Sequence, residues 1–271
     1  MNFSGQTVWI TGASSGIGAA LARELAADGA KVILSGRNEA ALATVAADCP
    51  TAVVLPFEST DYDALPALVE QAWNWQGAVD LLINNAGISQ RSLAVDTALP
   101  VYQRIVDVDL LAPIALTQAL LGRMVARGSG RLAFISSIAG KVGVPMRTAY
   151  CAAKHGLIGY ADALRAETAH LGLKVHVISP GSIRTDVSRN ALTADGSKRG
   201  QSDKVIDNGI EPAVAARAMI DAMLADQRDI IVAEGGEKQM GELRRTPDAL
   251  LDQVGGLMSA GYAARMAAEA Q

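Results

Sequence analysis

The chain has 271 residues, of which 50% are hydrophobic and 19% charged, and its formal net charge is −4. This length and composition suit one large α/β domain with a sizeable core. The small negative charge leaves no excess of Lys and Arg for a nucleic acid or an anionic membrane, so any phosphate must be held locally. Cys49 and Cys151 are too few for a disulfide framework and lack metal-ligand spacing, which favours a reducing compartment. His155 and His170 have no second ligand at metal spacing, so we expect no metal. We find neither a cleavable signal nor an apolar run of about 18 residues, and expect a cytoplasmic protein without a membrane span.

Seven short apolar or β-branched runs alternate with alanine- and leucine-rich stretches along the chain. The runs are residues 7–11, 31–35, 52–55, 80–83, 131–135, 174–178 and 229–232. The stretches around them predict helices over residues 17–28, 39–47, 62–75, 100–127, 149–170 and 212–225. Strands that are apolar on both faces are typical of a parallel sheet covered by helices on both sides. We therefore predict an α/β fold: a single-domain, Rossmann-like, doubly wound sheet of seven parallel strands, with ligands bound at its carboxyl edge.

The predicted Rossmann-like domain covers residues 1–235, and a helical C-terminal extension follows over residues 236–271. Within the domain, residues 186–210 are polar with little periodicity, as expected for a mobile lid beside the carboxyl edge. The extension has the pattern of two helices, around residues 247–254 and 261–270.

The two longest predicted helices, 100–127 and 149–170, have apolar faces wider than one face of a sheet requires. Such faces favour a subunit interface, so we expect a homodimer or homotetramer formed through these helices. A broad stripe facing the core is the alternative.

A glycine-rich segment, residues 11–18 with the sequence TGASSGIG, connects the first predicted strand to the first predicted helix. Gly12 permits the turn, Gly16 lets the backbone approach a ligand, and Gly18 lets the helix close on the sheet. Backbone amides and the N-terminus of a helix at this place bind a pyrophosphate. A strand-to-helix turn without a ligand is the alternative. The further cofactor contacts predicted in this loop are Ser14, Ser15 and Ile17.

The second predicted strand ends in the sequence SGRN, residues 35–38, without the acidic residue that would bind the adenosine ribose hydroxyls. Without a carboxylate here, nothing repels a 2′-phosphate on the adenosine ribose, and the guanidinium of Arg37 can pair with that phosphate. The sequence thus favours NADP(H) over NAD(H), with a solvated arginine in a turn as the alternative.

Tyr150 and Lys154 stand four residues apart on a predicted helix and therefore share one of its faces. A free phenol, with a pKa of about 10, exchanges protons poorly at neutral pH, but an adjacent cation favours the phenolate. Such pairs are common on helix surfaces, so the pair becomes informative only together with the other motifs.

Five motifs in order give the chain a specific resemblance to the short-chain dehydrogenase/reductases over about residues 7–232. They are the glycine loop, the sequence NNAG at residues 84–87, Ser137, the Tyr150 and Lys154 pair, and the sequence PG at residues 180–181. Residues 89–93 (SQRSL), with Asp96, Thr97 and Tyr102, are also similar to the dehydrogenase/reductase member 7 and 7B group. That likeness implies carbonyl substrates of lipid-like, steroid or retinoid type. Members of the group often have a membrane anchor, which we do not expect here.

The resemblance implies catalytic roles for four residues. Tyr150 is the general acid in reduction and the base in oxidation, while Lys154 binds the nicotinamide ribose and favours the phenolate. Ser137 holds the substrate oxygen. Asp109 occupies the position where the family usually has asparagine, and a carboxylate there can raise the pKa of Lys154.

The resemblance also implies further cofactor contacts. Glu58 takes the place of an adenine-binding aspartate, with an exposed loop glutamate as the alternative. The segment beneath the adenosine ribose is Asn85, Ala86 and Gly87. The segment around the nicotinamide carboxamide includes Pro180, Gly181, Ile183 and Thr185.

Together these features imply an NADP(H)-dependent oxidoreductase that transfers hydride between the nicotinamide and a small-molecule carbonyl or alcohol. A 3-oxoacyl-thioester reductase of fatty-acid type uses the same residues and is the alternative among enzymes. A nucleotide-sensing regulator is the alternative outside catalysis, although it has no need of Ser137, Tyr150 and Lys154 together. Arg91 and Arg184 are expected near the cleft, either binding an anionic substrate or solvated.

Overall fold

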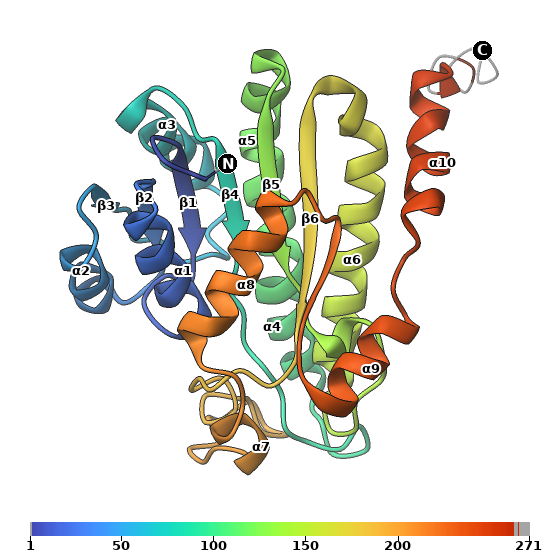
Figure 1. The fold of residues 1–271 in the computed structure, drawn as a ribbon. Coiled ribbons are helices and arrows are strands. Elements are labelled where there is room, and N and C mark those ends of the chain that lie inside the picture. The colour runs from blue at the N-terminus through green and yellow to red at the C-terminus, as the bar shows by residue number, and fades with distance from the viewer. Residues whose placement is uncertain (1, 263–264, 266–271) are drawn as a thin grey trace.

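The computed structural model of the chain describes residues 2–262 and 265. At the centre of this part lies a sheet of seven parallel strands in the order β3-β2-β1-β4-β5-β6-β7 (Figure 1). The strands are β1 (Thr7–Thr11), β2 (Lys31–Ser35), β3 (Ala52–Val54), β4 (Leu81–Asn84), β5 (Gly130–Ile135), β6 (Leu173–Pro180) and β7 (Asp229–Val232). The strand order reverses at β1, which pairs with both β2 and β4. Such a reversal opens a crevice at the carboxyl edge.

The predicted Rossmann-like, doubly wound fold is confirmed, and the strand bounds differ from the prediction by no more than two residues at an end. The apolar runs predicted the strands well, because parallel strands buried on both faces have continuous apolar sequences.

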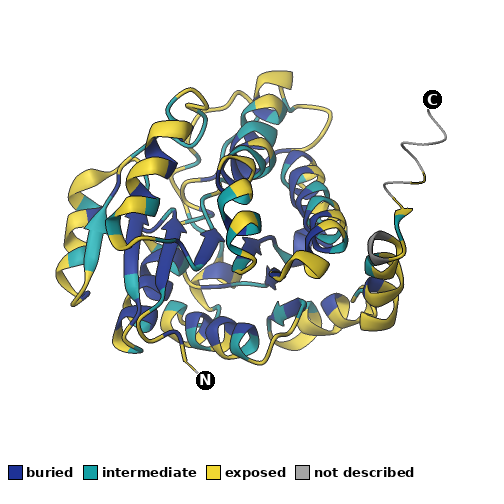
Figure 2. Cartoon of the chain, turned by 90° about the horizontal axis from the view of Figure 1, so that it is seen from above, coloured by how far each residue is buried: buried dark blue, intermediate teal, exposed yellow. Residues whose placement is uncertain are grey.

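Helices cover both faces of the sheet, as Figure 1 shows. On one face lie α1 (Gly16–Ala27), α2 (Glu39–Ala47) and α8 (Pro212–Leu224). On the other lie α3 (Leu65–Gln76), α5 (Ala112–Arg127) and α6 (Thr148–Thr168). Figure 2 shows that the strands are buried except for the edge strand β3, which is partly exposed, while each helix exposes its outer face. Each fully buried leucine stabilises this arrangement by about 2 kcal/mol, so the two helical layers hold the carboxyl edge in place.

The helix expected over residues 100–127 is one continuous run with a π-helical segment in its middle. α4 (Leu99–Val106) leads into η1 (Asp107–Leu111), which leads into α5. The π turn was not predicted, and it contains Asp109, which is fully buried. π turns inside α-helices often mark functional sites. Contrary to our expectation, one run among the described residues, Leu99–Arg127, is long and apolar enough for a membrane span; here it packs on the sheet and on α6.

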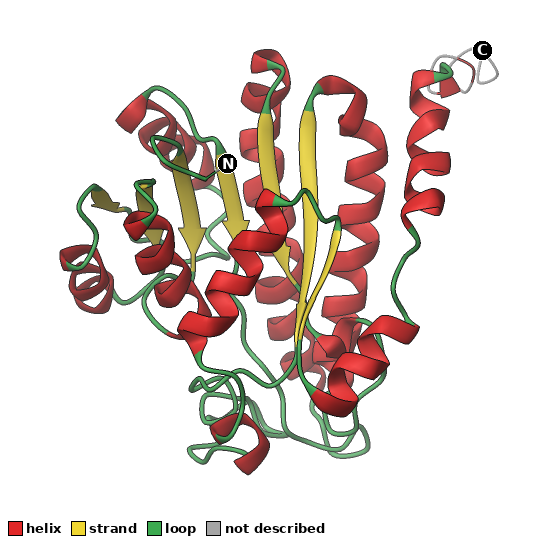
Figure 3. Cartoon of the chain, in the orientation of Figure 1, coloured by secondary structure: helices red, strands yellow, loops and turns green. Residues whose placement is uncertain are grey.

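Loops gather at the carboxyl edge (Figure 3), where the lid also lies. The predicted lid contains a short helix, α7 (Lys204–Asp207), and pairs with the loop after β4 through a bridge between Gln90 and Leu192.

In the extension, α10 (Asp248–Ser259) matches the first predicted helix, whereas α9 (Gly235–Leu243) was not predicted. α10 contacts α6 and so covers part of a helix expected to face another subunit. The helix expected around residues 261–270 falls largely outside the described residues.

Candidate functional site

A cleft of about 1060 Å³ runs along the carboxyl edge of the sheet. It is bordered by the glycine loop, the loops after β2, β4, β5 and β6, the start of α6, and the lid. Every catalytic and cofactor-binding residue predicted from the sequence lines this cleft, except Gly18, which lies beneath the glycine loop. The structure thus brings together residues from the whole length of the domain.

The glycine loop closes tightly between β1 and α1. Gly12 has a φ of +65°, and a Cβ there would lie 2.8 Å from the Ala86 Cα. A Cβ on Gly18 would collide with the Gly12 carbonyl oxygen. At the N-terminus of α1, the cap residue Ser15 makes no side-chain hydrogen bond to the helix. The first amides of α1 are therefore free to bind an anion, and this loop fits a dinucleotide pyrophosphate.

The loop after β4 supports the glycine loop from below. The Thr11 Oγ1 accepts hydrogen bonds from the amides of Asn85 at 3.0 Å and Ala86 at 3.1 Å. The Asn85 side chain donates to the Thr11 carbonyl at 2.9 Å. Asn85 therefore braces the loop through its side-chain amide. Sequence reasoning missed Thr11, although a polar residue ending an apolar strand was a usable signal.

At the adenosine end of the cleft, Arg37 forms an ion pair of 3.5 Å with Glu58. Arg104 of α4 also reaches Glu58, at 3.8 Å, and this arginine was not predicted because it occupies an ordinary polar position of a helix. Burial raises the pKa of Glu58, but the Arg37 charge, the Thr60 backbone amide and the Arg104 charge together hold it below its ordinary value. Glu58 is therefore a carboxylate shared by two arginines.

At the other end of the cleft, Tyr150 and Lys154 project from α6 as their spacing predicted. The Lys154 Nζ lies 5.6 Å from the centre of the Tyr150 ring and donates to the Ile135 carbonyl at 3.0 Å. Ser137 begins the turn after β5, and its Oγ accepts a hydrogen bond from the Ala139 amide at 3.1 Å. The neighbouring Ser136 is buried, and its hydroxyl donates to the Lys154 carbonyl at 3.0 Å. Of the two serines, Ser137 has the more open hydroxyl.

Asp109 lies directly against Lys154 in the interior. Its Oδ2 is 3.2 Å from the Lys154 Nζ, and its Oδ1 accepts from the Ile88 amide at 2.8 Å. Burial alone would lower the pKa of Lys154, but the Asp109 carboxylate, with a further contribution from Tyr150, more than offsets this and raises it. A Cβ on Gly87 would lie 3.0 Å from the Asp109 Oδ2, so a side chain there would press on this ion pair. The expected influence of Asp109 on Lys154 is thus a direct contact between side chains.

The end of β6 and the loop after it complete this end of the cleft with four of the predicted residues. They are Pro180, Gly181, Ile183 and Thr185. The lid closes over the same end, and its contribution to the cleft includes Val187, Asn190, Leu192, Lys198 and Ile206. The lid thus brings apolar side chains together with Asp186, Asn190 and Lys198 to this end of the cleft.

The two arginines expected near the substrate lie elsewhere. Neither Arg91 nor Arg184 lines the cleft. The Arg91 side chain is only 8% exposed and pairs with Asp203 of the lid at 2.7 Å, so it is neither solvated nor free for a substrate.

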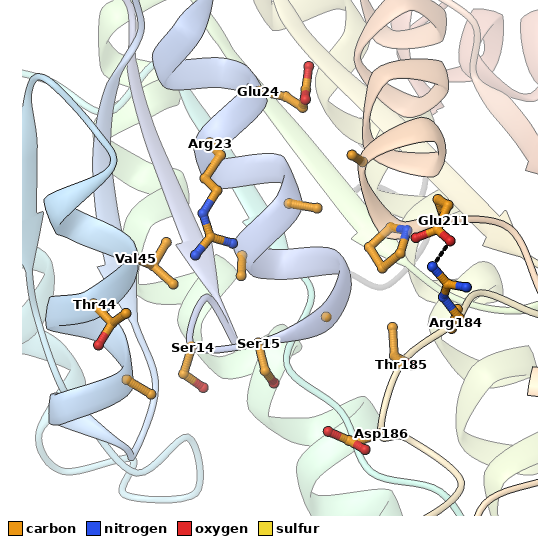
Figure 4. A pocket seen from close by; sticks show the side chains of 16 residues that line it. Ser14, Ser15, Arg23, Glu24, Thr44, Val45, Arg184, Thr185, Asp186 and Glu211 are labelled. Carbon is orange, nitrogen blue, oxygen red and sulfur yellow. Dashed lines mark ion pairs between the residues drawn. The ribbon is translucent and has the colours of Figure 1, made fainter. Parts of the chain in front are cut away.

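Arg184 instead lines a second pocket, of about 560 Å³, between α1, α2 and α8. Figure 4 shows it directed at Glu211, with which it forms an ion pair. Ser14, Ser15 and Thr185 line both pockets, so this pocket adjoins the cleft at the glycine loop. Within the described residues, no group of His, Cys, Asp or Glu has a metal-binding arrangement.

Comparisons with known proteins agree with this geometry. The family model described as short chain dehydrogenase matches residues 6–196. Dehydrogenase/reductase SDR family member 7B of Danio rerio is 38% identical over 263 residues, covering 93% of this chain and 85% of the relative. Dehydrogenase/reductase SDR family protein 7-like of Drosophila melanogaster is 40% identical over 240 residues, covering 85% of this chain and 73% of the relative. These matches confirm both the family and the finer likeness inferred from the motifs.

Solved structures have the same fold. A short-chain dehydrogenase from Streptomyces avermitilis has a TM-score of 0.79 and 29% identity, covering 98% of this chain and 99% of its own. A short chain dehydrogenase/reductase from Burkholderia phymatum, solved in complex with NAD, has a TM-score of 0.77. It is 20% identical and covers 85% of this chain and 90% of its own, so it supports the fold alone.

Proposed function

This chain belongs to the short-chain dehydrogenase/reductase family of oxidoreductases, and we propose that it transfers hydride between NADP(H) and a small-molecule carbonyl or alcohol. One observation carries the proposal. A single cleft has an anion-binding glycine loop and Arg37 at one end, and Ser137, Tyr150 and Lys154 at the other.

The cofactor fits the residues present. The uncapped N-terminus of α1 and the close approach permitted at Gly12 and Gly16 suit a pyrophosphate. When bound, the reduced nicotinamide supplies a hydride to the carbonyl carbon. The residues that would hold the cofactor are those of the glycine loop and of the loops after β4 and β6.

Tyr150 moves the proton that balances the hydride. In reduction its hydroxyl donates a proton to the carbonyl oxygen, so that hydride and proton together convert the carbonyl to an alcohol. Ser137 orients that oxygen by a hydrogen bond. The phenolate left on Tyr150 is stabilised by the Lys154 ammonium until a proton from solvent restores the phenol. In oxidation the same phenolate accepts the proton of the alcohol.

Asp109 acts through Lys154. Because its carboxylate keeps Lys154 protonated and also accepts from the Ile88 amide, it fixes the ammonium in place beside Tyr150. It also offsets part of the ammonium charge. We therefore treat Asp109 as a positioning residue and expect it to set the pH range over which the Tyr150 and Lys154 pair works.

Preference for NADP(H) rests on Arg37. Its side chain is 65% exposed at the cleft, and its partner Glu58 has Arg104 as a second partner. A 2′-phosphate can therefore pair with Arg37 in place of Glu58, and Glu58 keeps Arg104 as its partner. Bidentate contact between guanidinium and phosphate is stronger than an exposed pair with a carboxylate.

Replacing Tyr150 with Phe tests the proposal. We expect NADPH oxidation in the presence of a panel of ketones and aldehydes to fall by about 1000-fold, with NADPH affinity retained. Tyr160, whose hydroxyl bonds to Gln118 away from the cleft, provides the matched control Tyr160→Phe. Unchanged turnover in Tyr150→Phe would refute the role of Tyr150.

A further inference from the structure

The C-terminal extension begins at the carboxyl edge of the sheet, where β7 ends. α9 begins three positions after the last residue of β7 and lies below the ends of β6 and β7 in Figure 1. It contacts the turn that follows Ser137. None of its residues lines the cleft, so any effect on the site passes through the loops that do.

Glu237 of α9 binds the loop after β6 through both of its carboxylate oxygens. Its Oε2 accepts from the Ser182 amide at 2.7 Å, and its Oε1 accepts from the Ser182 hydroxyl at 2.9 Å. A Cβ on Gly181 would collide with the Glu237 Oε2, so the glycine before Ser182 makes room for this carboxylate. Ser182 lies between Gly181 and Ile183, which both line the cleft.

A second set of contacts ties the extension to the turn after β5. A Cβ on Gly241 of α9 would lie 2.8 Å from the Ile138 side chain, so the helix packs closely on the residue after Ser137. Lys141, at the end of that turn, forms a buried ion pair of 2.6 Å with Asp229 of β7. The same Asp229 oxygen accepts from the Thr246 amide of the extension at 3.0 Å. Both loops that border the reacting end are thus attached to the extension.

We propose that Glu237 is a positioning residue for the nicotinamide end of the cofactor, acting by fixing the backbone of the loop after β6. This inference rests on the proposed function and gives the extension a part in it. A carboxylate that accepts two hydrogen bonds from one residue restricts that residue more than a single neutral bond does. Loss of Glu237 then loosens Gly181 and Ile183 without touching the adenosine end of the cleft.

The test compares two ligands that differ only in the nicotinamide. NADPH and 2′-phospho-ADP-ribose are titrated by calorimetry into the full-length protein and its variants, and NADH with ADP-ribose serves as a second pair. For Glu237→Ala we expect NADPH affinity to fall by about tenfold, while 2′-phospho-ADP-ribose affinity changes by less than about twofold. Glu237→Gln keeps an amide oxygen for Ser182, so its loss should be smaller.

Two further variants complete the test. Glu242→Gln is the matched control, because Glu242 lies on the same helix and, among the residues that the structure describes, its side chain pairs only with Arg245, at 3.7 Å. Ser182→Ala removes one of the two bonds and should resemble Glu237→Gln even if Glu237→Ala fails to fold. Equal losses for both ligands, or no loss for either, would overturn the role of Glu237. A wild-type protein that binds neither NADPH nor NADH would instead refute the proposed function, and this inference with it.

Discussion

Two ion pairs of similar length lie at opposite ends of the same cleft, in very different surroundings. Lys154 and Asp109 are 3.2 Å apart, and their side chains are 4% and 0% exposed. Arg37 and Glu58 are 3.5 Å apart, and theirs are 65% and 38% exposed. The attraction between charges depends on their surroundings more than on a few tenths of an ångström, because water screens the exposed pair and not the buried one.

The difference in burial suits the two ion pairs to different roles. A buried pair is costly to break, so Lys154 stays charged and in place beside Tyr150. An exposed pair contributes little, so Arg37 can leave Glu58 for a phosphate at little cost. The reacting end of the cleft is thus preorganised, whereas side chains at the adenosine end rearrange when the ligand binds.

The matched substitutions Asp109→Asn and Glu58→Gln test this comparison through stability. We expect Asp109→Asn to lower the free energy of unfolding by about 2–3 kcal/mol, because it leaves the buried Lys154 cation without its carboxylate. This lies at the low end for a broken buried pair, since the amide oxygen can still accept from Ile88. Glu58→Gln should cost less than about 0.5 kcal/mol. Urea denaturation measures both, and equal losses would contradict the comparison.

Arg37→Asp tests the exposed pair through cofactor choice. We expect NADPH affinity, followed by cofactor fluorescence, to fall by about 30-fold, because a guanidinium contact is replaced by repulsion of the 2′-phosphate. NADH affinity should hold or rise, since the new carboxylate can accept from the ribose hydroxyls. Arg104→Gln is the control and should change the ratio of the two affinities little. A wild-type preference for NADH would remove the argument for NADP(H).

The pH dependence of reduction tests the buried pair in a second way. The Asp109 carboxylate raises the pKa of Lys154, so Asp109→Asn should let Lys154 lose its proton at lower pH. Loss of that proton moves the alkaline limb of the reduction rate to lower pH, by about one unit. An unmoved limb in Asp109→Asn, or an equal shift in Glu58→Gln, would show that Asp109 does not act through Lys154.

The smallest expected effect is that of Glu58→Gln on cofactor binding. Removing the carboxylate frees Arg37 from a competitor, so NADPH affinity should rise by about threefold. NADH affinity should change less, because NADH has no 2′-phosphate to gain from the freed arginine. Calorimetric titration separates the two, and a loss of NADPH affinity would indicate that Glu58 itself contacts the cofactor.

Local patterns predicted the sheet and the residues that line the cleft. Glycine spacing, a phenol and an ammonium one helical turn apart, and apolar runs at regular intervals are signals carried within short segments. The glycine loop and the Tyr150 and Lys154 pair therefore came from the sequence. The sequence also predicted a role for Asp109, but its direct contact with Lys154 depends on a π turn that no local sequence pattern predicts.

Long-range partners had no such signal. Glu237 meets Ser182 across 55 positions, and Arg91 meets Asp203 across 112. Both acids have sequence neighbours typical of solvated surfaces, and only the folded chain brings them to their partners. For the same reason, α9, which has many exposed residues and no clear apolar stripe, was not expected as a helix.

Hydride transfer itself is the central claim, and an isotope label tests it most directly. The protein is incubated with a reactive ketone from the panel and with NADPH deuterated at C4, using each of the two stereoisomers in turn, and the alcohol is analysed by mass spectrometry. We predict one deuterium on the carbinol carbon with one stereoisomer and none with the other, with product formation strongly reduced in Tyr150→Phe. An alcohol without deuterium from either stereoisomer, or equal product from Tyr150→Phe, would contradict the account.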